Sequence, residues 1–410
     1  MKFLYKIAIS AYSLFLKVAA VFNPKARLFV RGRKNWKRKL ASKIETNARY
    51  VWVHCASLGE FEQGRPLIEA IREQHPEYRI VLTFFSPSGY EIRKNYEHAD
   101  VISYLPIDTQ HNANTFLNII QPEKAFFIKY EYWVHYFEEL NKRYIPLYIV
   151  SAIFREEQQF FKNTHWGKWY RKMLYKVTHF YLQDKQSASL LQALGILQYT
   201  ITGDTRFDRV AAIANATKEI PVVANFKDNK LLIVAGSTWK PDEDLLADYF
   251  KDISSAKLII APHEVNETNL TRIEAGYKNI ARLSKVKAED AHKYDVLLVD
   301  SVGLLSSIYS YGNIAYIGGG FGVGIHNILE AATFGLPVIF GPNYQKFKEA
   351  VDLQSMGGAF PVNNSTGLKD ALNTFINDPL KLKKASDVCK HYVSLNVGST
   401  QKIVDKVFKL

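Results

Sequence analysis

The sequence predicts an α/β protein with two Rossmann-like domains that face a central cleft, and a membrane-associated helix at the N-terminus. Past residue 48, short apolar segments alternate with amphipathic segments, which is the pattern of parallel α/β domains. A length of 410 residues suits two hydrophobic cores better than one. The weakest pattern falls over residues 203–230 and separates two strand–helix sets. These features predict an arm over 1–44, a first domain over 45–205, a linker over 206–230, a second domain over 231–390 and a C-terminal helix over 391–410.

The first element is an apolar helix over residues 3–22. Lys6 and Lys17 interrupt it, so it falls short of the roughly 20 apolar residues that a spanning helix needs. We therefore favour a helix that lies in the membrane interface. A cleaved signal peptide and a helix docked on the protein's own core remain the alternatives. Its apolar face is formed by Leu4, Ile7, Ala11, Phe15, Val18 and Phe22.

The basic residues are concentrated in the same arm. Residues 1–44 contain 12 Lys and Arg and no Asp or Glu, whereas the rest of the chain contains 41 basic and 40 acidic residues. A nucleic-acid-binding protein would spread basic residues over a folded face, so we expect no nucleic-acid partner. A basic run after the helix is attracted to anionic lipid, and it comprises Arg31, Arg33, Lys34, Lys37, Arg38, Lys39 and Lys43.

Past the arm, the predicted elements follow in a regular order. We expect strands at 50–54, 80–84, 101–104, 125–128, 146–150 and 180–182 in the first domain. In the second domain we expect them at 231–235, 257–261, 296–299, 314–317 and 337–340. Helices are expected between the strands, for example at 64–74, 133–142, 187–194, 242–250 and 266–275. Two cysteines, Cys55 and Cys389, and no CxxC or HExxH spacing predict neither a disulfide framework nor a zinc site.

The most informative segment runs from Gly318 to Pro342. An apolar strand ends in three glycines, and a helix expected to open at His326 carries Glu330 in its first turns. Glycines and a helix N-terminus at such a junction favour an anion, and a carboxylate one turn further on can accept hydrogen bonds from ribose hydroxyls. The pattern indicates a nucleotide site, although an ordinary strand–helix turn with glycines for packing gives the same letters.

In parallel sheets ligands lie beyond the carboxyl ends of the strands. After the first strand, Ser57 and Glu60 have the spacing of a capping box, and Glu60 is equally a candidate general base. Ser88 and Glu91 repeat that spacing after the second strand, where capping is the better interpretation. Glu131 follows the fourth strand, so two carboxylates would share one edge of the sheet.

The second domain offers its own polar residues at strand ends. Ser237 and Thr238 follow one strand, and His263 follows the next. Asp242 and Asp244 spell DxD, which suggests a metal, but beside Pro241 they are better explained as acidic residues in the first turn of a helix.

Taken together, these motifs closely resemble bacterial 3-deoxy-D-manno-octulosonic acid (Kdo) transferases of lipid A biosynthesis over about residues 1–405. The resemblance implies a GT-B fold and an inverting transfer of Kdo from CMP-Kdo to a lipid A precursor, lipid IVA, without metal or cofactor, at the cytoplasmic face of the inner membrane. It assigns acceptor binding to the first domain and donor binding to the second. The motifs are HCASLGE (54–60), TFFSPSGYE (83–91), KYEYW (129–133), GDTRFD (203–208), AGSTW (235–239), APHEVNE (261–267), VDSVGLL (299–305) and GIHNILEAATFGLPVIFGP (324–342).

The resemblance also assigns residues. Glu60 matches the catalytic base, with Ser57, Gly59, Ser88 and Glu131 as acceptor-side candidates. Nucleotide and phosphate contacts match Ser237, Thr238, His263, Gly319, Gly320, His326, Asn327 and Glu330, and Arg206 is a candidate for the carboxylate of Kdo.

The chain departs from the family pattern in three places. Ser151-Ala152-Ile153 stands where Asn-Ala-Arg is common, Arg206 stands where Lys is common, and Leu304 stands where Glu is usual. The Arg206 change keeps the charge, whereas the Leu304 change removes a carboxylate. Two rival functions stay open: another nucleotide-sugar enzyme on the same fold, such as a UDP-sugar transferase or epimerase, and an inactive membrane-surface module.

Overall fold

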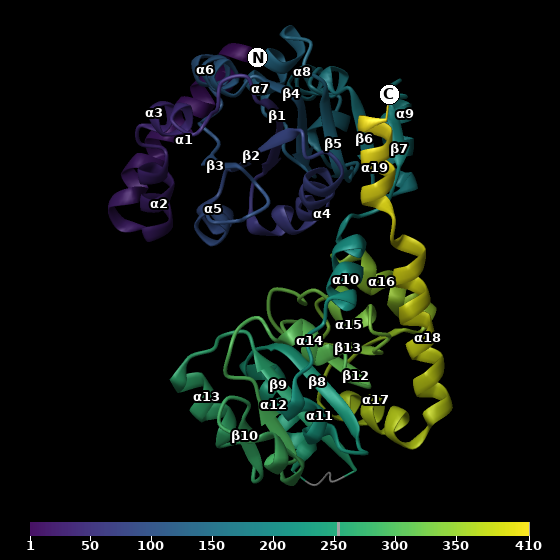
Figure 1. Cartoon of the computed structure of the whole chain (residues 1–410). Helices are drawn as coiled ribbons and strands as arrows, with labels where there is room; N and C mark the ends of the chain where they lie inside the picture. The colour runs from purple at the N-terminus through teal and green to yellow at the C-terminus, as the bar shows by residue number, and fades with distance from the viewer. Residues whose placement is uncertain (252–254, 410) are drawn as a thin grey trace. The chain divides into compact units, whose positions relative to one another are not determined.

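The computed structural model of the protein describes residues 1–251 and 255–409. The chain forms two compact units, which we call unit 1 (Met1–Arg209 with Gly398–Leu410) and unit 2 (Val210–Val397). Each unit contains one seven-stranded sheet with helices packed against it (Figure 1). All strand pairs in both sheets are parallel, which confirms the predicted α/β class.

The sheet of unit 1 has the order β3-β2-β1-β4-β5-β6-β7. Its strands are β1 (Arg49–Cys55), β2 (Tyr78–Phe84), β3 (Val101–Tyr104), β4 (Pro122–Ile128), β5 (Leu147–Ala152), β6 (His179–Leu182) and β7 (Tyr199–Ile201). Its helices are α1 (Lys2–Phe22), α2 (Pro24–Gly32), α3 (Trp36–Ala41), α4 (Leu58–Gln74), α5 (Pro87–Arg93), α6 (Gln110–Ile120), α7 (Val134–Lys142), α8 (His165–Arg171), α9 (Lys185–Ala193) and α19 (Ser399–Phe408), with 3-10 turns at Gln159–Phe161 and Leu174–Lys176. Helix α10 (Arg206–Asn215) begins in this unit and continues into unit 2.

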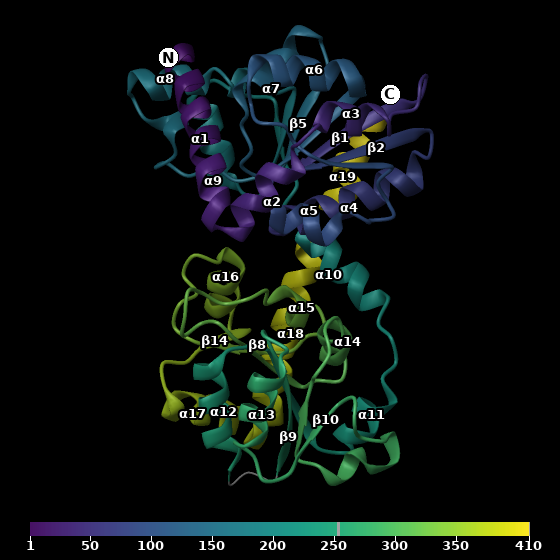
Figure 2. The same ribbon diagram turned by 90° about the vertical axis from the view of Figure 1, so that its left-hand side faces the viewer.

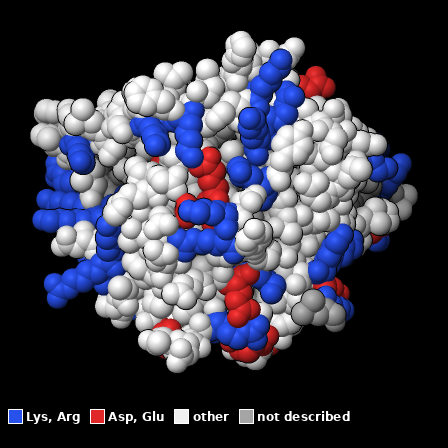
Figure 3. Space-filling view, turned by 90° about the horizontal axis from the view of Figure 1, so that it is seen from above, with Lys and Arg blue, Asp and Glu red and all other residues white. Residues whose placement is uncertain are grey.

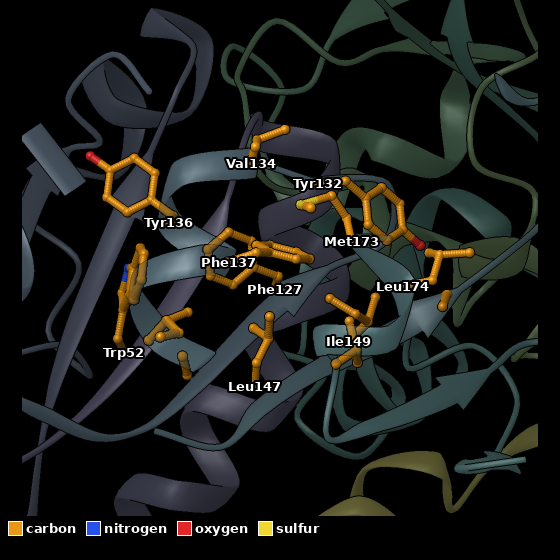
Figure 4. Packing of buried hydrophobic residues seen from close by; sticks show 14 of the residues in the cluster. Trp52, Phe127, Tyr132, Val134, Tyr136, Phe137, Leu147, Ile149, Met173 and Leu174 are labelled. Atoms are coloured by element: carbon orange, nitrogen blue, oxygen red, sulfur yellow. The ribbon is translucent and has the colours of Figure 1, made fainter. Parts of the chain in front are cut away.

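The core of unit 1 lies on both faces of its sheet. Val51 and Val53 belong to one buried cluster and Trp52 to another, because alternate residues of a strand point to opposite faces. Figure 4 shows the second cluster, in which Trp52 and Phe127 pack below the helix that carries Tyr136 and Phe137. Burial on both faces explains why the strands are almost continuously apolar.

The C-terminal segment returns to unit 1. Helix α19 packs on α4 and adds Ile403 and Val404 to the core. Asp208 accepts hydrogen bonds from the backbone N–H of Gly398 at 2.5 Å and of Thr400 at 2.7 Å. We expected one helix over 391–410, and this prediction is wrong. Helix α18 ends at Asn396, and Gly398, with φ of 102°, turns the chain into α19.

The sheet of unit 2 has the order β10-β11-β9-β8-β12-β13-β14. Its strands are β8 (Leu231–Thr238), β9 (Ala256–Pro262), β10 (Ile280–Arg282), β11 (Val296–Leu298), β12 (Ile314–Ile317), β13 (Val338–Phe340) and β14 (Ala359–Pro361). Its helices are α11 (Pro221–Lys227), α12 (Lys240–Phe250), α13 (Glu267–Glu274), α14 (Leu305–Tyr309), α15 (Leu329–Ala332), α16 (Lys348–Met356), α17 (Ser365–Asn377) and α18 (Pro379–Asn396), with a 3-10 turn at Ala288–Lys293.

All eleven predicted strands are present, and the three that the sequence missed are β7, β10 and β14. Each has three residues and lies at an edge of its sheet. A three-residue edge strand is too short to produce an alternating or continuous apolar pattern. The stretch 206–230, which we expected to link the domains, forms α10 and α11.

Helix α1 has one docked side and one bare side. On the docked side, the Tyr5 hydroxyl donates to Asp108 at 2.6 Å, and the Tyr5 ring lies 5.8 Å from that of Trp169 on α8. Figure 2 shows α1 beside α8. The predicted apolar face is exposed, and with the residues beside it comprises Phe3, Leu4, Ile7, Ala11, Leu14, Phe15, Val18, Val21 and Phe22. By length and composition α1 is apolar enough to cross a membrane, and its bare side is compatible with membrane association.

The basic run after α1 divides into two groups. Arg33 donates to the backbone carbonyls of Leu105, Phe29 and Phe85 and lies over the Phe29 ring at 3.5 Å, so it joins α2 to the sheet rather than facing lipid as we predicted. The other six are exposed: Arg31, Lys34, Lys37, Arg38, Lys39 and Lys43. Figure 3 shows Lys and Arg side chains projecting along the side of unit 1 on which α2 and α3 lie in Figure 1.

Candidate active site

The first half of the site is built where β1 ends and α4 begins. The Ser57 backbone N–H donates to Glu60 Oε2 at 3.1 Å, and the Glu60 N–H donates to Ser57 Oγ at 3.5 Å. This reciprocal pair is the predicted capping box. It holds the Glu60 carboxylate against the start of the helix, where only 9% of the residue is exposed.

Burial changes the chemistry of this carboxylate. Desolvation, followed by the nearby charge of Glu131, raises the pKa of Glu60 to about 7, while the backbone N–H groups of Ala56 and Ser57 and the charge of Lys129 oppose the rise. A carboxylate with a pKa near neutrality is matched to taking a proton from a hydroxyl group at neutral pH. Capping and base chemistry are therefore compatible in this residue.

Glu131 lies at the same edge of the sheet because β1 and β4 are neighbouring parallel strands. Its side chain is 17% exposed, and its Oε2 lies 3.7 Å from Nε2 of the buried His54. Lys129, two residues before it, has φ of 68°, a conformation that costs a non-glycine residue free energy and that clusters at functional sites. The two predicted carboxylates thus lie within electrostatic range of each other.

Arg206 lies in unit 1, not among the residues of the glycine-rich loop. Its Nε donates to Asp204 Oδ2 at 2.9 Å, and Gln63 donates to both oxygens of the same carboxylate at 3.1 Å. Arg206 and Arg155 both act electrostatically on the hydroxyl of Tyr130, as does Glu60. Positive charge is therefore available beside the carboxylate pair.

The remaining unit 1 candidates differ in what they contact. Gly59 lies in the first turn of α4, and a Cβ added there would have Ser57 Oγ as its nearest neighbour, at 4.0 Å. Ser88 is exposed, and the cap of α5 is Ser86, which accepts from the Ser88 N–H at 3.2 Å. The predicted Ser88–Glu91 capping box is wrong, because Glu91 turns instead to Tyr104 and Lys94.

In unit 2, the polar residues after β8 have separate roles. Ser237 has φ of 54°, and no side-chain partner is found for it within residues 1–251 and 255–409. The buried Thr238 hydroxyl donates to Glu243 at 2.9 Å and so points into the protein. Only Ser237 of this pair presents a hydroxyl group for a ligand.

The glycine-rich loop is fastened by an aspartate. Asp242 accepts from the N–H groups of Trp239 at 2.9 Å and Gly319 at 3.0 Å, and from the Tyr316 hydroxyl at 2.8 Å. It is 1% exposed, and its capping of α12 agrees with the first-turn interpretation of DxD. The N–H of Gly319 is therefore already occupied.

The neighbouring glycines pack against backbone. A Cβ on Gly318 would lie 2.3 Å from the Ser237 carbonyl oxygen, and one on Gly320 would lie 2.6 Å from the Gly341 nitrogen. The helix that follows, α15, has four residues and begins at Leu329, so the predicted helix N-terminus at His326 is wrong. Such a short helix has no useful dipole, and a phosphate here must rely on side chains.

Glu330 is oriented by two donors. Ser306 Oγ donates to its Oε2 at 2.7 Å, and Asn327 Nδ2 donates to its Oε1 at 3.1 Å. The residue is only half-buried, so the carboxylate can also accept from a ligand.

Three aromatic rings stack beside the loop. The His263 ring lies between those of Trp239 and His326, with centroid separations of 4.5 and 4.6 Å. Trp239 Nε1 donates to His326 Nε2 at 3.1 Å, which leaves Nδ1 as the donor of the neutral His326 ring. Burial, then the neighbouring His263, lowers the pKa of His326, which favours the neutral ring.

A pocket of about 510 Å³ opens beside the loop and is mostly apolar. Of the predicted donor residues only Gly319 and His326 line it. The other lining residues are Trp239, Pro241, Asp242, Phe321, Gly322, Val323, Gly324, Ile325 and Phe347. Phe347, which reaches the pocket from the start of α16, carries no motif that predicts this position.

Sequence reasoning also missed His54 and Thr83. Both are polar residues on otherwise apolar buried strands, and that mismatch is visible in the letters HCASLGE and TFFSPSGYE. Across residues 1–251 and 255–409, no group of three or more His, Cys, Asp or Glu side chains is arranged to hold a metal ion.

The chain is similar in sequence to known proteins. A family profile described as 3-deoxy-D-manno-octulosonic-acid transferase (kdotransferase) matches residues 33–209. The chain is 27% identical over 344 residues to the 3-deoxy-D-manno-octulosonic acid transferase of Aquifex aeolicus, and the alignment covers 81% of this chain and 88% of that protein.

Solved structures show the fold. The UDP-GlcNAc 2-epimerase of Neisseria meningitidis, solved with UDP-GlcNAc, superposes with a TM-score of 0.64 at 15% identity, covering 88% of this chain and 100% of that chain. MurG of Acinetobacter baumannii superposes with a TM-score of 0.56 at 13% identity, with the same coverage. These likenesses place the chain in the GT-B fold class.

The open first turn of α4 gives a first prediction. Gly59→Ala introduces no clash, and replacing a helical glycine raises stability by about 0.5–1 kcal/mol. If a substrate approaches Glu60 over this turn, the added methyl group lowers kcat/KM at least about tenfold, equivalent to 1.4 kcal/mol. Chemical denaturation and steady-state kinetics measure the two effects. Gly367→Ala on α17, where the nearest atom is 3.6 Å away, is the matched control, and equal activity of the two variants would contradict the prediction.

Proposed function

We propose that this chain acts as a member of the Kdo transferase family of glycosyltransferases, which its sequence matches, and that it transfers Kdo from CMP-Kdo to lipid IVA with inversion at the anomeric carbon. The observation that carries the mechanism is the buried Glu60, whose pKa is raised to about 7 beside Glu131. In the reaction a hydroxyl oxygen of the acceptor bonds to the anomeric carbon of Kdo. The bond from that carbon to the phosphate oxygen breaks, CMP leaves with the electron pair, and Glu60 takes the hydroxyl proton.

We assign the contacts to CMP from the polar groups of unit 2 that the fold leaves able to bind a ligand. Glu330, held by Ser306 and Asn327, accepts from the ribose hydroxyls of CMP. The Ser237 hydroxyl and Nδ1–H of His326 donate to the phosphate, because the Gly319 N–H is committed to Asp242. Hydrogen-bond donors aimed at developing charge lower the barrier to departure of the phosphate.

Arg206 supplies the cation that the carboxylate of Kdo requires. Its guanidinium is steadied by Asp204, and a guanidinium can bind a carboxylate through two N–H groups. With these donors in place, we propose a reaction that needs no resident metal or cofactor.

The acceptor is a lipid, and the bare side of α1 suits a protein that works at a membrane surface. An exposed apolar helix side followed by a basic run favours an anionic membrane surface, at about 1 kcal/mol per basic residue near it. We place the enzyme on the cytoplasmic face of the inner membrane, because basic segments stay on that side.

A second candidate function is a UDP-sugar enzyme, since the Neisseria epimerase has the same fold and was solved with UDP-GlcNAc. A shared fold at 15% identity does not decide the nucleotide. The choice between CMP and UDP is therefore built into the donor-site test below.

The base assignment predicts the effect of Glu60→Gln. Glutamine keeps the capping box but cannot take the proton, so transfer of Kdo should fall by about 10²–10⁴-fold. CMP affinity should stay unchanged. In the wild type, kcat/KM should fall as the pH drops through about 7, because Glu60 becomes protonated. Radiolabelled Kdo transfer and calorimetry measure these effects. Glu62→Gln on the same helix is the control, and near-normal turnover of Glu60→Gln would show that another group is the base.

The donor site predicts that Glu330→Gln weakens CMP binding at least about tenfold, because the amide replaces an acceptor oxygen with a donor. Isothermal titration with CMP and UDP measures both affinities, and the exposed Glu289→Gln is the control. CMP should bind more tightly than UDP. Tighter binding of UDP would favour the second candidate function, and an unchanged CMP affinity in Glu330→Gln would refute the ribose contact.

If the bare side of α1 binds the membrane, the triple variant Phe15→Ser, Val18→Ser and Phe22→Ser should bind vesicles more weakly than the wild type. These three exposed side chains each lose roughly 1.5–3 kcal/mol of possible apolar burial. Flotation with vesicles containing anionic phospholipid should show at least about tenfold weaker binding. Leu380→Ser with Leu395→Ser, exposed apolar residues of α18, is the control. If the triple variant floats as well as the control, α1 does not bind the membrane.

A further inference from the structure

A chain of buried polar side chains leads to the carboxylate pair and has no part in the mechanism above. Trp52, Thr83 and His54 are each 0% exposed. Trp52 Nε1 donates to Thr83 Oγ1 at 2.8 Å, and Thr83 Oγ1 lies 2.9 Å from His54 Nδ1. His54 Nε2 has no hydrogen-bond partner and lies 3.7 Å from Glu131 Oε2. The chain thus begins in the core, at the Trp52 ring of Figure 4, and ends at the site.

The hydrogen-bonding capacity of these groups decides which ring nitrogen carries the proton. The Trp52 indole can only donate, so Thr83 Oγ1 accepts from it. The Thr83 hydroxyl then has one proton to place, and within the described part of the chain its remaining partner is His54 Nδ1. A buried hydroxyl without an acceptor is costly. The Thr83 hydroxyl therefore donates to Nδ1, and the neutral ring carries its hydrogen on Nε2.

This tautomer directs an N–H group at Glu131. The separation of 3.7 Å exceeds a hydrogen bond, and a small rotation of the partly exposed Glu131 side chain closes it. An N–H donor favours the ionised carboxylate. Ionised Glu131 in turn disfavours ionisation of Glu60, which is the second cause of the raised pKa of Glu60 after burial.

Other titratable groups face the same pair. Lys129 acts against Glu131 by favouring ionised Glu60. Electrostatic interactions with the pair or with its neighbour Tyr130 also involve Cys55, Tyr130, Tyr132, Arg155, Tyr170, Asp204 and Arg206. None of these groups is in the buried chain, so changes within the chain alter the pair through His54 alone.

We propose that Trp52, Thr83 and His54 position the catalytic pair: they present an N–H group to Glu131, keep that carboxylate ionised, and so make Glu60 the carboxylate that exchanges the proton. His54 is a positioning residue that acts through Glu131 and does not touch the substrate. The inference rests on the proposed role of Glu60 as base.

The test measures the protonation of the Glu60 and Glu131 carboxyl groups by NMR, and it measures transfer kinetics in separate assays. Full-length protein carrying glutamate with ¹³C in the side-chain carboxyl group is titrated by NMR, with the signals assigned from Glu60→Gln and Glu131→Gln. Thr83→Val removes the hydroxyl donor, and His54→Phe fills the same buried space without nitrogen. Thr83→Ser and His54→Gln retain the donors. Thr202→Val changes a buried threonine whose hydroxyl has no partner, and so controls for the substitution itself.

In the wild type the Glu60 signal should titrate near pH 7. In Thr83→Val and His54→Phe its midpoint should fall by at least about half a pH unit, because Glu131 then holds part of the proton and no longer repels the charge of Glu60. In these two variants the acidic limb of the pH profile of kcat/KM should shift to lower pH, and kcat should drop. Thr83→Ser, His54→Gln and Thr202→Val should have the midpoint and the kinetics of the wild type.

A Glu60 midpoint that is the same in Thr83→Val, His54→Phe and Thr202→Val would overturn the proposal. This outcome is distinct from failure of the proposed function. If Glu60→Gln keeps full transfer activity, Glu60 is not the base, yet the NMR titration still reports whether the buried chain sets the protonation of the pair.

Discussion

The capping of α4 by Glu60 is the interaction on which the site depends. A strand that ends in the middle of a parallel sheet must pass into a helix whose first N–H groups have no intrahelical partner. Glu60 meets part of that need by accepting from Ser57, and in doing so it is drawn to the edge of the sheet and out of water. Burial in this position, together with the charge of Glu131, raises the pKa of Glu60 to about 7, although the Ser57 N–H itself opposes the rise. A residue that serves only the backbone would not need Glu131 beside it.

In unit 2 a carboxylate also caps a helix, but its role is structural. Asp242 also lies in the first turn of a helix that follows a strand, and it also caps its helix. Three donors occupy its two oxygens, and it is 1% exposed, so it fastens the glycine-rich loop and takes no part in proton transfer. Glu60 accepts from the backbone N–H groups of Ser57 and Ala56. The number of donors around each carboxylate separates a structural acid from a reactive one.

Helix α1 combines two properties that were alternatives in the sequence. Its Tyr5 side docks on the body through Asp108 and Trp169, whereas the opposite side leaves a row of apolar residues bare. The basic residues behind it divide in the same way, since Arg33 serves the fold and most of its neighbours face solvent. The arm is thus fixed to unit 1 and still offers a surface that suits lipid.

The sequence by itself determined the α/β class, eleven of the strands, the Ser57–Glu60 capping box and the position of Glu131 at a neighbouring strand end, because all of these depend on local periodicity and on the rule that parallel strands end at one edge. Only the tertiary structure decided what each polar group contacts. Thr238 and the Gly319 N–H proved to be occupied by Glu243 and Asp242, the helix before Gly335 shrank to one turn, and Arg206 joined unit 1. His54 and Thr83 were visible as letters but had no meaning until the fold placed them in line with Glu131. The reason is that hydrogen-bond partners distant in the chain leave no trace in local spacing, whereas burial and capping do.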